Sequence, residues 1–323
     1  MTTLTTTGVT YPDGRTRTTA QPFRYRDKAI FAYGYQYSSQ SMSNLVSNTG
    51  LISTDVTGVG TARSSIAAAG YGGDKSIFGY GDKNSGVVSL TNLVSNTGVV
   101  GNDVSGIGTI RVRLAAAGYG GDKAIFGYGD NASSTVYSMT NLISNIGVVS
   151  NDVTGVGTAR THLAAVTYGG DKAIFGYGEA LSTILFYSLT NLVSNTGVVG
   201  NDVTGVGTAR SFLAAASYGG DKAIFGYGAT YSAGTIYQSL TNLVTNTGVV
   251  GNDVTGVGYN RGSLAAASYG GDKAIFAYGV NNASGGLGVV NMSNLVTNTG
   301  VVSNDVTGVG TTRQGLAAAG YGS

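Results

Sequence analysis

The stretch YGGDKAIFGYG stands at residues 119–129, 168–178 and 218–228, and at residues 71–81 it differs only by Ser76. A fifth copy, with one change near its end, begins at Tyr269, and a shortened form, RDKAIFAYG, occupies residues 26–34. The Asp-Lys pairs of these copies follow one another at intervals of 47, 48, 49, 50 and 51 residues: they begin at Asp27, Asp74, Asp122, Asp171, Asp221 and Asp272. A copied unit of this length indicates a repeat protein.

The composition of the 323 residues favours strands over helices. The chain has 54 Gly, 21 Tyr, 2 Pro, no Trp and no Cys. Tightly turned strands suit many Gly, Val, Thr and Tyr residues, and no stretch keeps the apolar spacing of three and four that a helix needs. We therefore predict an all-β protein, and the absence of cysteine excludes disulfides and thiol chemistry.

One repeat predicts four short strands. Residues 213–218 (LAAASY), 223–227 (AIFGY), 236–244 (IYQSLTNLV) and 249–253 (VVGND) are separated by Gly-rich or Asn-Thr-Gly turns. Four strands in about fifty residues are typical of a β-propeller blade. The first strand is almost pure alanine, which suits the innermost position, where large side chains would collide.

Six copies predict a six-bladed β-propeller with four antiparallel strands in each blade. Residues 27–33 form a second strand that has no first strand before it, and residues 315–322 form a first strand that has no others after it. We expect these two ends to complete one blade together, which would remove exposed sheet edges. The expected domains are an N-terminal extended arm, residues 1–22, and the propeller, residues 23–323.

The repeats resemble two known groups of proteins. The pattern R-x-x-LAAAxYGGDKAIFGYG, followed by TNLVSNTGVVGNDVTGVGTAR, is similar to a kelch repeat from Arg24 to Ser323. Near-identical tandem copies of this kind also resemble arrays in virion or tail-associated proteins of tailed bacteriophages. The first resemblance implies a propeller, and the second implies a virion component assembled in the host cytoplasm.

The differences between the copies indicate where a ligand would bind. The segment between the second and third strands grows through 8, 9, 10, 11, 12 and 13 residues, at 35–42, 82–90, 130–139, 179–189, 229–240 and 280–292. Two residues after each repeated Arg also vary, and both variable segments are expected on one face, because loops on a rigid array carry recognition. The expected ligand-binding residues mix aromatic and polar side chains: Tyr35, Tyr37, Asp82, Lys83, Asn84, Arg113, Asp130, Asn131, His162, Glu179, Phe212, Tyr231, Asn281 and Asn282. The alternative is that these loops are solvated segments with no ligand.

The charged groups give little support for catalysis. The framework charges cancel, and the net charge of +2 gives no general attraction to nucleic acid. His162 and Glu179 are the single His and Glu, so an acid–base pair could be assembled only from loop tips, and no metal or cofactor is expected. Six repeated arginines are expected to join the copies by hydrogen bonds or ion pairs, the alternative being a ring of anion sites: Arg63, Arg111, Arg160, Arg210, Arg261 and Arg313.

The N-terminal segment is Thr-rich and ends in a small basic cluster from Arg15 to Arg26, interpreted as a docking or a solvated segment. It shows neither a secretion signal nor a membrane-spanning run. We expect a non-enzymatic binding module, a phage tail-fibre or tail-tip component that recognises a host surface glycan and contacts other virion proteins through the arm. The alternatives are a virion decoration protein without a ligand and a glycan-active enzyme.

Overall fold

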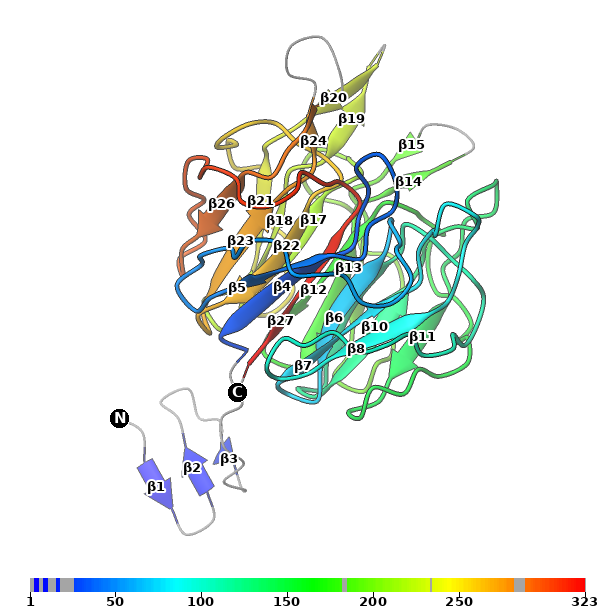
Figure 1. The fold of residues 1–323 in the computed structure, drawn as a ribbon. Coiled ribbons are helices and arrows are strands. Elements are labelled where there is room, and N and C mark those ends of the chain that lie inside the picture. Colours follow the sequence, from blue (N-terminus) through cyan, green and yellow to red (C-terminus); the bar gives the residue numbers. More distant parts are fainter. Residues whose placement is uncertain are drawn as a thin grey trace.

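The computed structural model describes residues 26–181, 185–232, 234–281 and 288–322, together with three short strands nearer the N-terminus (Figure 1). These ranges contain strands and loops but no α-helix, so none of their segments is a helix that could cross a membrane. The prediction of an all-β protein is confirmed.

The described part of residues 26–322 contains six antiparallel sheets of three strands; five are each built from one continuous stretch of the chain, and the sixth joins β27 near the end of the chain to β4 and β5 near its beginning. In every sheet the strand that begins at the lysine of the Asp-Lys pair lies in the middle, and its residues after that lysine are buried, because both of its edges are paired and both of its faces are covered. The sheets, each in its order of pairing, are β27 (Ala317–Tyr321), β4 (Lys28–Ala32) and β5 (Ser43–Val46); β6 (Ala67–Tyr71), β7 (Lys75–Gly79) and β8 (Thr91–Val94); β9 (Ala115–Tyr119), β10 (Lys123–Gly127) and β11 (Thr140–Ile143); β12 (Ala164–Tyr168), β13 (Lys172–Gly176) and β16 (Thr190–Val193); β17 (Ala214–Tyr218), β18 (Lys222–Gly226) and β21 (Thr241–Val244); β22 (Ala265–Tyr269), β23 (Lys273–Ala277) and β26 (Ser293–Val296).

The expected fourth strand of each repeat is present only as isolated bridges. Beside β16, Val199 bridges Val193 and Val203 bridges Thr190, so the outer segment has one residue more than the strand that it faces. Such a mismatch is a β-bulge, which interrupts the ladder. The side chain of Asn191 occupies the interruption and donates from Nδ2 to the carbonyl of Gly200 at 3.0 Å. The prediction of four strands per sheet is therefore corrected to three strands with a bulged outer segment.

The alanine-rich first strands lie side by side. β6, β9, β12, β17 and β22 pack against one another in chain order, and β27 packs against both β22 and β6. Small side chains allow this close approach. Larger side chains fill the space further out, where each sheet meets the next; the rings of Tyr128 and Phe175, for example, lie 5.0 Å apart.

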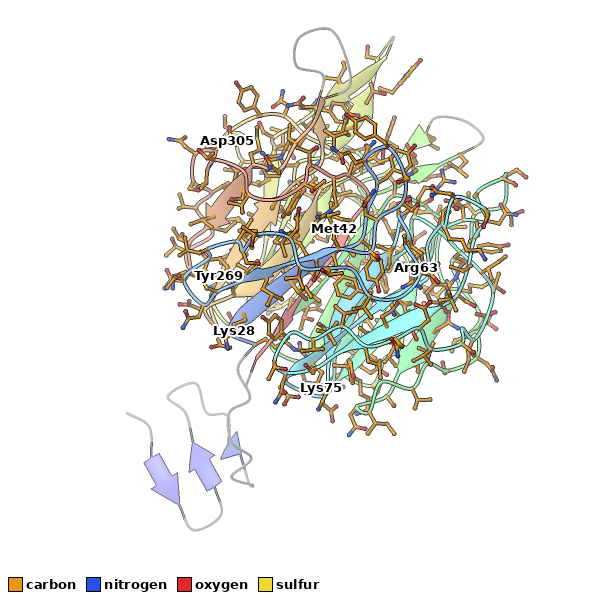
Figure 2. All side chains as sticks on the ribbon, viewed as in Figure 1. Lys28, Met42, Arg63, Lys75, Tyr269 and Asp305 are labelled. Atoms are coloured by element: carbon orange, nitrogen blue, oxygen red, sulfur yellow. The ribbon has the colours of Figure 1, made fainter. Side chains whose placement is uncertain are left out.

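Backbone hydrogen bonds join consecutive sheets where the first strand turns into the second. The N–H of Gly72 donates to the carbonyl of Asp122 at 2.7 Å, and the same bond recurs between later copies. Figure 2 shows Lys28 and Lys75, which begin β4 and β7, at this end of the molecule. The series returns to its first member through three further steps: Gly219 to Asp272, Gly270 to Asp27, and Gly322 to Asp74.

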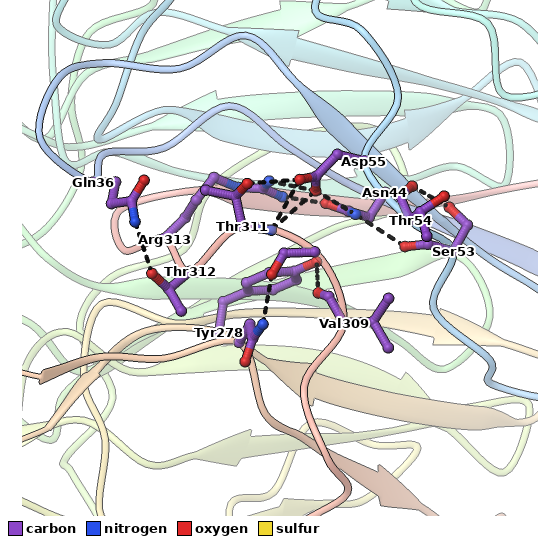
Figure 3. A network of polar contacts seen from close by, with 12 residues as sticks. Gln36, Asn44, Ser53, Thr54, Asp55, Tyr278, Val309, Thr311, Thr312 and Arg313 are labelled. Carbon is purple, nitrogen blue, oxygen red and sulfur yellow. Dashed lines mark hydrogen bonds and ion pairs between the residues drawn. The ribbon is translucent and has the colours of Figure 1, made fainter.

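The repeated arginines lie between consecutive sheets. Figure 3 shows the last of them, Arg313, whose Nη2 donates to Oδ1 of Asn44 at 2.6 Å and whose Nη1 lies 3.6 Å from Asp55. Thr311, two residues earlier, donates its hydroxyl to the other oxygen of Asp55 at 2.6 Å. Burial by itself would raise the pKa of Asp55, but the hydrogen bonds from Thr311 and Asn44 outweigh burial and lower it.

A buried tyrosine completes each of these contacts. The guanidinium carbon of Arg313 lies 4.7 Å from the ring centre of Tyr278, and the Tyr278 hydroxyl donates to the carbonyl of Val309 at 3.2 Å. Tyr278 has φ of 65°, a left-handed conformation that is rare for an aromatic residue and needs firm packing to hold it. Burial raises the pKa of this tyrosine to about 12. The same Arg–Tyr arrangement holds at Arg63, Arg111, Arg160, Arg210 and Arg261, and all six arginines are fully buried.

The described strands of the N-terminal segment pair with one another. β1 (Thr3–Thr5), β2 (Gly8–Thr10) and β3 (Thr16–Arg17) form a small antiparallel sheet of their own. The segment expected as an extended arm therefore contains paired strands. The expected boundary between residues 22 and 23 lies outside the described residues.

Candidate functional site

The loops of graded length change their structure as they lengthen. The three longest form hairpins: β14 (Glu179–Ala180) with β15 (Leu185–Phe186), β19 (Ala229–Tyr231) with β20 (Thr235–Tyr237), and β24 (Val280–Asn281) with β25 (Gly288–Val289). The shorter ones make single bridges, such as Asp130 to Val136. Figure 1 shows β14, β19 and β24 at one end of the molecule. We call this end the loop face.

The variable residues after each arginine lie beside the start of the loop in the same repeat. Val112 bridges Asp130, Thr161 bridges Glu179, and Ser211 bridges Ala229. The two variable segments of a repeat are therefore neighbours in space, although about seventeen residues separate them in the chain.

Two residues vary after each repeated arginine, and the second of the two takes part in a ring of backbone hydrogen bonds. All six have left-handed φ values between 51° and 59°, which turn their N–H and carbonyl groups toward the two neighbouring repeats. Each N–H donates to the carbonyl of the residue before it in the series, at 2.7 to 3.0 Å, and the first donates to the last. The six members are Ser65, Arg113, His162, Phe212, Ser263 and Gly315.

This ring surrounds a cavity of about 300 Å³, the loop-face cavity. Tyr35 and Gln314 line it together with the members of the ring. Apart from Ser64, its remaining lining is apolar and comes from the residues that follow the ring in each repeat: Ile66, Leu114, Leu163, Leu213, Leu264 and Leu316. An apolar lining with a few polar groups is typical of small-ligand sites.

Arg113 and Asp130 form an ion pair on one side of the cavity, with Nη2 of the arginine 2.8 Å from Oδ1 of the aspartate. Asp130 is completely buried, and its oxygens also accept hydrogen bonds from the N–H of Ala132 and from the hydroxyl of Thr161 in the next repeat. A buried carboxylate needs such donors because burial removes its water. The ion pair thereby fixes both the Asp130 loop and the direction of Arg113.

His162 and Glu179 repeat this arrangement one sheet further on. Nδ1 of His162 lies 2.7 Å from Oε1 of Glu179, and the hydroxyl of Ser211 donates to Oε2 at 3.0 Å. The ring of His162 stacks on Phe212, with 3.8 Å between the ring centres. Burial lowers the pKa of His162, although its hydrogen bond to Glu179 acts in the opposite direction. Both rings are half-buried at the cavity, with an angle of 37° between their planes.

Asp82 occupies the corresponding position on the preceding sheet but lacks these donors. Its Oδ1 is buried and has no hydrogen-bond partner among the described residues. The position that supplies a hydroxyl to Asp130 and to Glu179 is here Val112, which cannot donate. Asp82 therefore lies at the loop face without the hydroxyl donor that Asp130 and Glu179 have.

The other expected binding residues lie apart from this cluster. Tyr37 and Tyr231 are 89% and 50% exposed on their loops, and Lys83 is also exposed. Three asparagines differ in their surroundings: Asn84 accepts hydrogen bonds from Ser39, Asn131 accepts from the backbone of its own loop, and Asn281 is buried in β24. Asn282 lies outside the described residues.

Sequence reasoning missed three side chains and one backbone feature. In the sequence, Thr161, Ser211 and Gln314 are only variable positions. A hydroxyl at a variable position could have indicated a donor to the single Glu or to a non-repeated Asp. The ring of backbone hydrogen bonds leaves no side-chain pattern in the sequence. It could be found only in three dimensions.

The described residues contain no group of three or more His, Cys, Asp or Glu side chains placed to hold a metal ion. No protein-family model matches the chain, and no curated protein matches it.

Proposed function

We propose that the six sheets form a closed six-bladed propeller. Two observations support a closed ring: both series of backbone hydrogen bonds return to their first member, and Arg313 near the end of the chain binds Asn44 near its beginning. The pairing of β27 with β4 places the join within one sheet. A ring held by many hydrogen bonds at its join makes a rigid platform for loops.

A disulfide across the join tests this closure. Tyr35 and Gln314 form an isolated antiparallel bridge, and the chain has no cysteine of its own. Tyr35→Cys with Gln314→Cys should therefore oxidise to an intramolecular disulfide, because opposite residues of neighbouring strands meet the distance requirement. Tyr231→Cys with Gln314→Cys is the matched control. Equal oxidation of both pairs, or dimers only, would count against a closed ring.

For function, we propose a non-enzymatic binding module whose ligand is a glycan held at the loop face. The observation that carries this proposal is the loop-face cavity, because a ring of backbone bonds present in all six repeats surrounds it and side chains that differ between the repeats line it. A constant backbone ring with variable side chains suits a scaffold that keeps its geometry while its ligand specificity changes. The resemblance to phage repeat arrays makes a host surface glycan the expected ligand and a virion the expected setting.

The chemistry of the lining supports a sugar. Phe212 stacked on His162, with Tyr35 also at the cavity, provides rings for the apolar face of a pyranose. Gln314, Ser263 and Ser65 provide amide and hydroxyl groups that can bind sugar hydroxyls.

A glycan array followed by calorimetry tests the proposal. Phe212→Ala should weaken binding of any glycan found by roughly fivefold or more, because a stacked ring contributes about 1 kcal/mol or more. Asn195→Ala, which removes an exposed side chain bonded to Asp171, is the control and should leave the affinity unchanged. Unchanged affinity in Phe212→Ala, or no glycan bound by the parent protein, would refute a glycan site in this cavity.

A second function, packing within a virion as a decoration protein, is favoured by the outer segments. Each repeat exposes an aliphatic side chain just after its Asn-Thr-Gly or equivalent turn: Leu51, Val99, Val148, Val198, Val249 and Val301, which are 57% to 73% exposed. Repeated exposed apolar residues suit contact with neighbouring proteins. If this function holds, Val99→Asp with Val198→Asp should abolish incorporation into particles, whereas Phe212→Ala should not.

A further inference from the structure

A second cavity lies between the alanine-rich strands and has a volume of about 1040 Å³. Alanines and glycines of β6, β9, β12, β17, β22 and β27 form most of its wall. We call it the central cavity. Walls of this kind bind nothing specifically, so any recognition there depends on the few polar groups that reach it.

The lining also includes Lys75, Asp122, Asn145 and Asp221, and the polar groups of the inner strands are distributed unevenly around the wall. At the position before the last tyrosine of the first strand, three consecutive sheets carry a hydroxyl and the other three carry glycine. Ser268 donates to the carbonyl of Ser217, Ser217 to that of Thr167, and Thr167 to that of Gly118, at 2.7 to 2.9 Å. The remaining members of this circle are Gly70 and Gly320.

Arg26 occupies the half of the circle that has no hydroxyl. A Cβ atom built on Gly70 would lie 2.4 Å from the guanidinium carbon of Arg26, and one built on Gly320 would lie 3.2 Å from its Cβ. A side chain at position 70 would therefore displace the guanidinium of Arg26 from its place. Arg26 itself lines the cavity and begins the shortened copy, at the position where the other copies have the second glycine of Gly-Gly.

This arginine differs from the six arginines between the sheets. Each of those donates from Nη2 to an asparagine, although Nε of five of them has no partner among the described residues. In Arg26 both Nε and Nη2 are buried and have no hydrogen-bond partner among the described residues. Burial lowers the pKa of Arg26 to about 10, against the attraction of Asp74, so the guanidinium still carries its charge at neutral pH. A buried cation without acceptors is costly unless an anion accompanies it.

We propose that the central cavity binds an oxyanion, a phosphate or a carboxylate, through Arg26. A guanidinium presents paired donors that match both groups. The hydroxyls of Thr167, Ser217 and Ser268 line the same cavity; each has donated its hydrogen to a neighbouring carbonyl and retains acceptor capacity only, which suits the water around a hydrated anion. The cavity is larger than phosphate needs, so the anion either enters free or is carried at the end of a chain.

Calorimetry on the full chain, in a buffer without other oxyanions, tests the site. The probes are inorganic phosphate and a short peptide with either a free or an amidated C-terminus. The parent protein should bind phosphate or the free-carboxylate peptide at one site, and Arg26→Met should weaken binding by roughly tenfold or more. Lys273→Met is the matched control, because it also removes a positive charge but one that is half exposed and lies outside the lining of the cavity. It should bind as the parent does.

The outcomes separate the possible ligands. Binding of phosphate identifies a free oxyanion site, and binding of only the free-carboxylate peptide identifies a site for a chain end. Absence of both, or equal binding by Arg26→Met, overturns the proposal.

Stability provides a second measurement that does not depend on the affinity of one probe. Arg26→Met should be at least as stable as the parent without anions, because it removes a buried guanidinium of which two nitrogens have no hydrogen-bond partner among the described residues, and it should gain nothing from the probe that binds the parent. A destabilised Arg26→Met that still gains stability from that probe would also refute the site.

Discussion

The backbone N–H of Ser65 donates to the carbonyl of Gly315 at 2.7 Å, although 250 residues separate the two in the chain. The bond continues a series in which Arg113, His162, Phe212 and Ser263 take part at similar distances. This bond, at the join between the two ends of the chain, is as short as the others. The two ends of the array therefore meet without distortion.

The join should therefore be as sensitive to strain as any other place in the ring. Ser65 and Ser263 have φ of 53° and 51°, which a β-branched residue adopts only with strain. We expect Ser65→Val and Ser263→Val each to lower the free energy of unfolding by about 1–3 kcal/mol. Denaturant titration of both variants measures this, and a loss in Ser263→Val alone would mean that the join is open or loose.

The buried arginines should dominate the stability of the contacts between sheets. Arg313→Ala leaves Asn44 and Asp55 without their cation in a site where the arginine is fully buried. We expect a loss of about 3–5 kcal/mol in the free energy of unfolding. Lys273→Ala, which removes an ion pair of two half-exposed side chains, is the control and should cost about 1 kcal/mol or less. Similar losses in both variants would contradict the structural role of the arginine.

A donor supplied to Asp82 should stabilise the loop face. Val112 is buried and has the shape of threonine, and Thr161 provides such a donor to Asp130 one sheet further on. We expect Val112→Thr to raise the free energy of unfolding by about 0.5–1.5 kcal/mol. The double-mutant cycle with Asp82→Ala is the control, because the gain should vanish when the acceptor is absent. An equal effect in both backgrounds would show that the hydroxyl does not reach Asp82.

Alkaline pH should unfold the protein cooperatively. Burial raises the pKa of Tyr33, Tyr128, Tyr177, Tyr227 and Tyr278 from 10.0 to about 12. The folded state therefore resists losing these protons, so its stability is complete below pH 10 and falls as the pH rises from 10 to 12.

Absorbance at 295 nm and circular dichroism, followed together, measure this effect. The buried tyrosines should ionise in the same transition that removes the sheet signal. Tyr227→Phe lacks one of the five groups and should give a shallower pH dependence. Ionisation of all tyrosines near pH 10 with the sheets intact would contradict the prediction.

Much of the sheet architecture could be read from repetition, because the same strand signals recur at a nearly constant interval. The bulge was missed because it depends on how Asn191 meets the backbone of Gly200, a contact between two segments nine residues apart that no propensity describes. The cluster at the loop face was found in part: the break in repetition pointed to Arg113, His162 and Glu179. Their pairing with Asp130, Phe212 and Ser211 follows from the order of sheets in space.

The sequence by itself determined the number of units, their β character and the places where they differ, since each of these is local or recurs at a fixed interval. Only the tertiary structure decided which groups meet. It brings Ser65 to Gly315, and it brings Arg26 to Gly70 and Gly320 of the inner strands. The physical reason is that backbone N–H groups and small residues are alike everywhere in the chain. Their role appears only when packing brings a specific partner within reach.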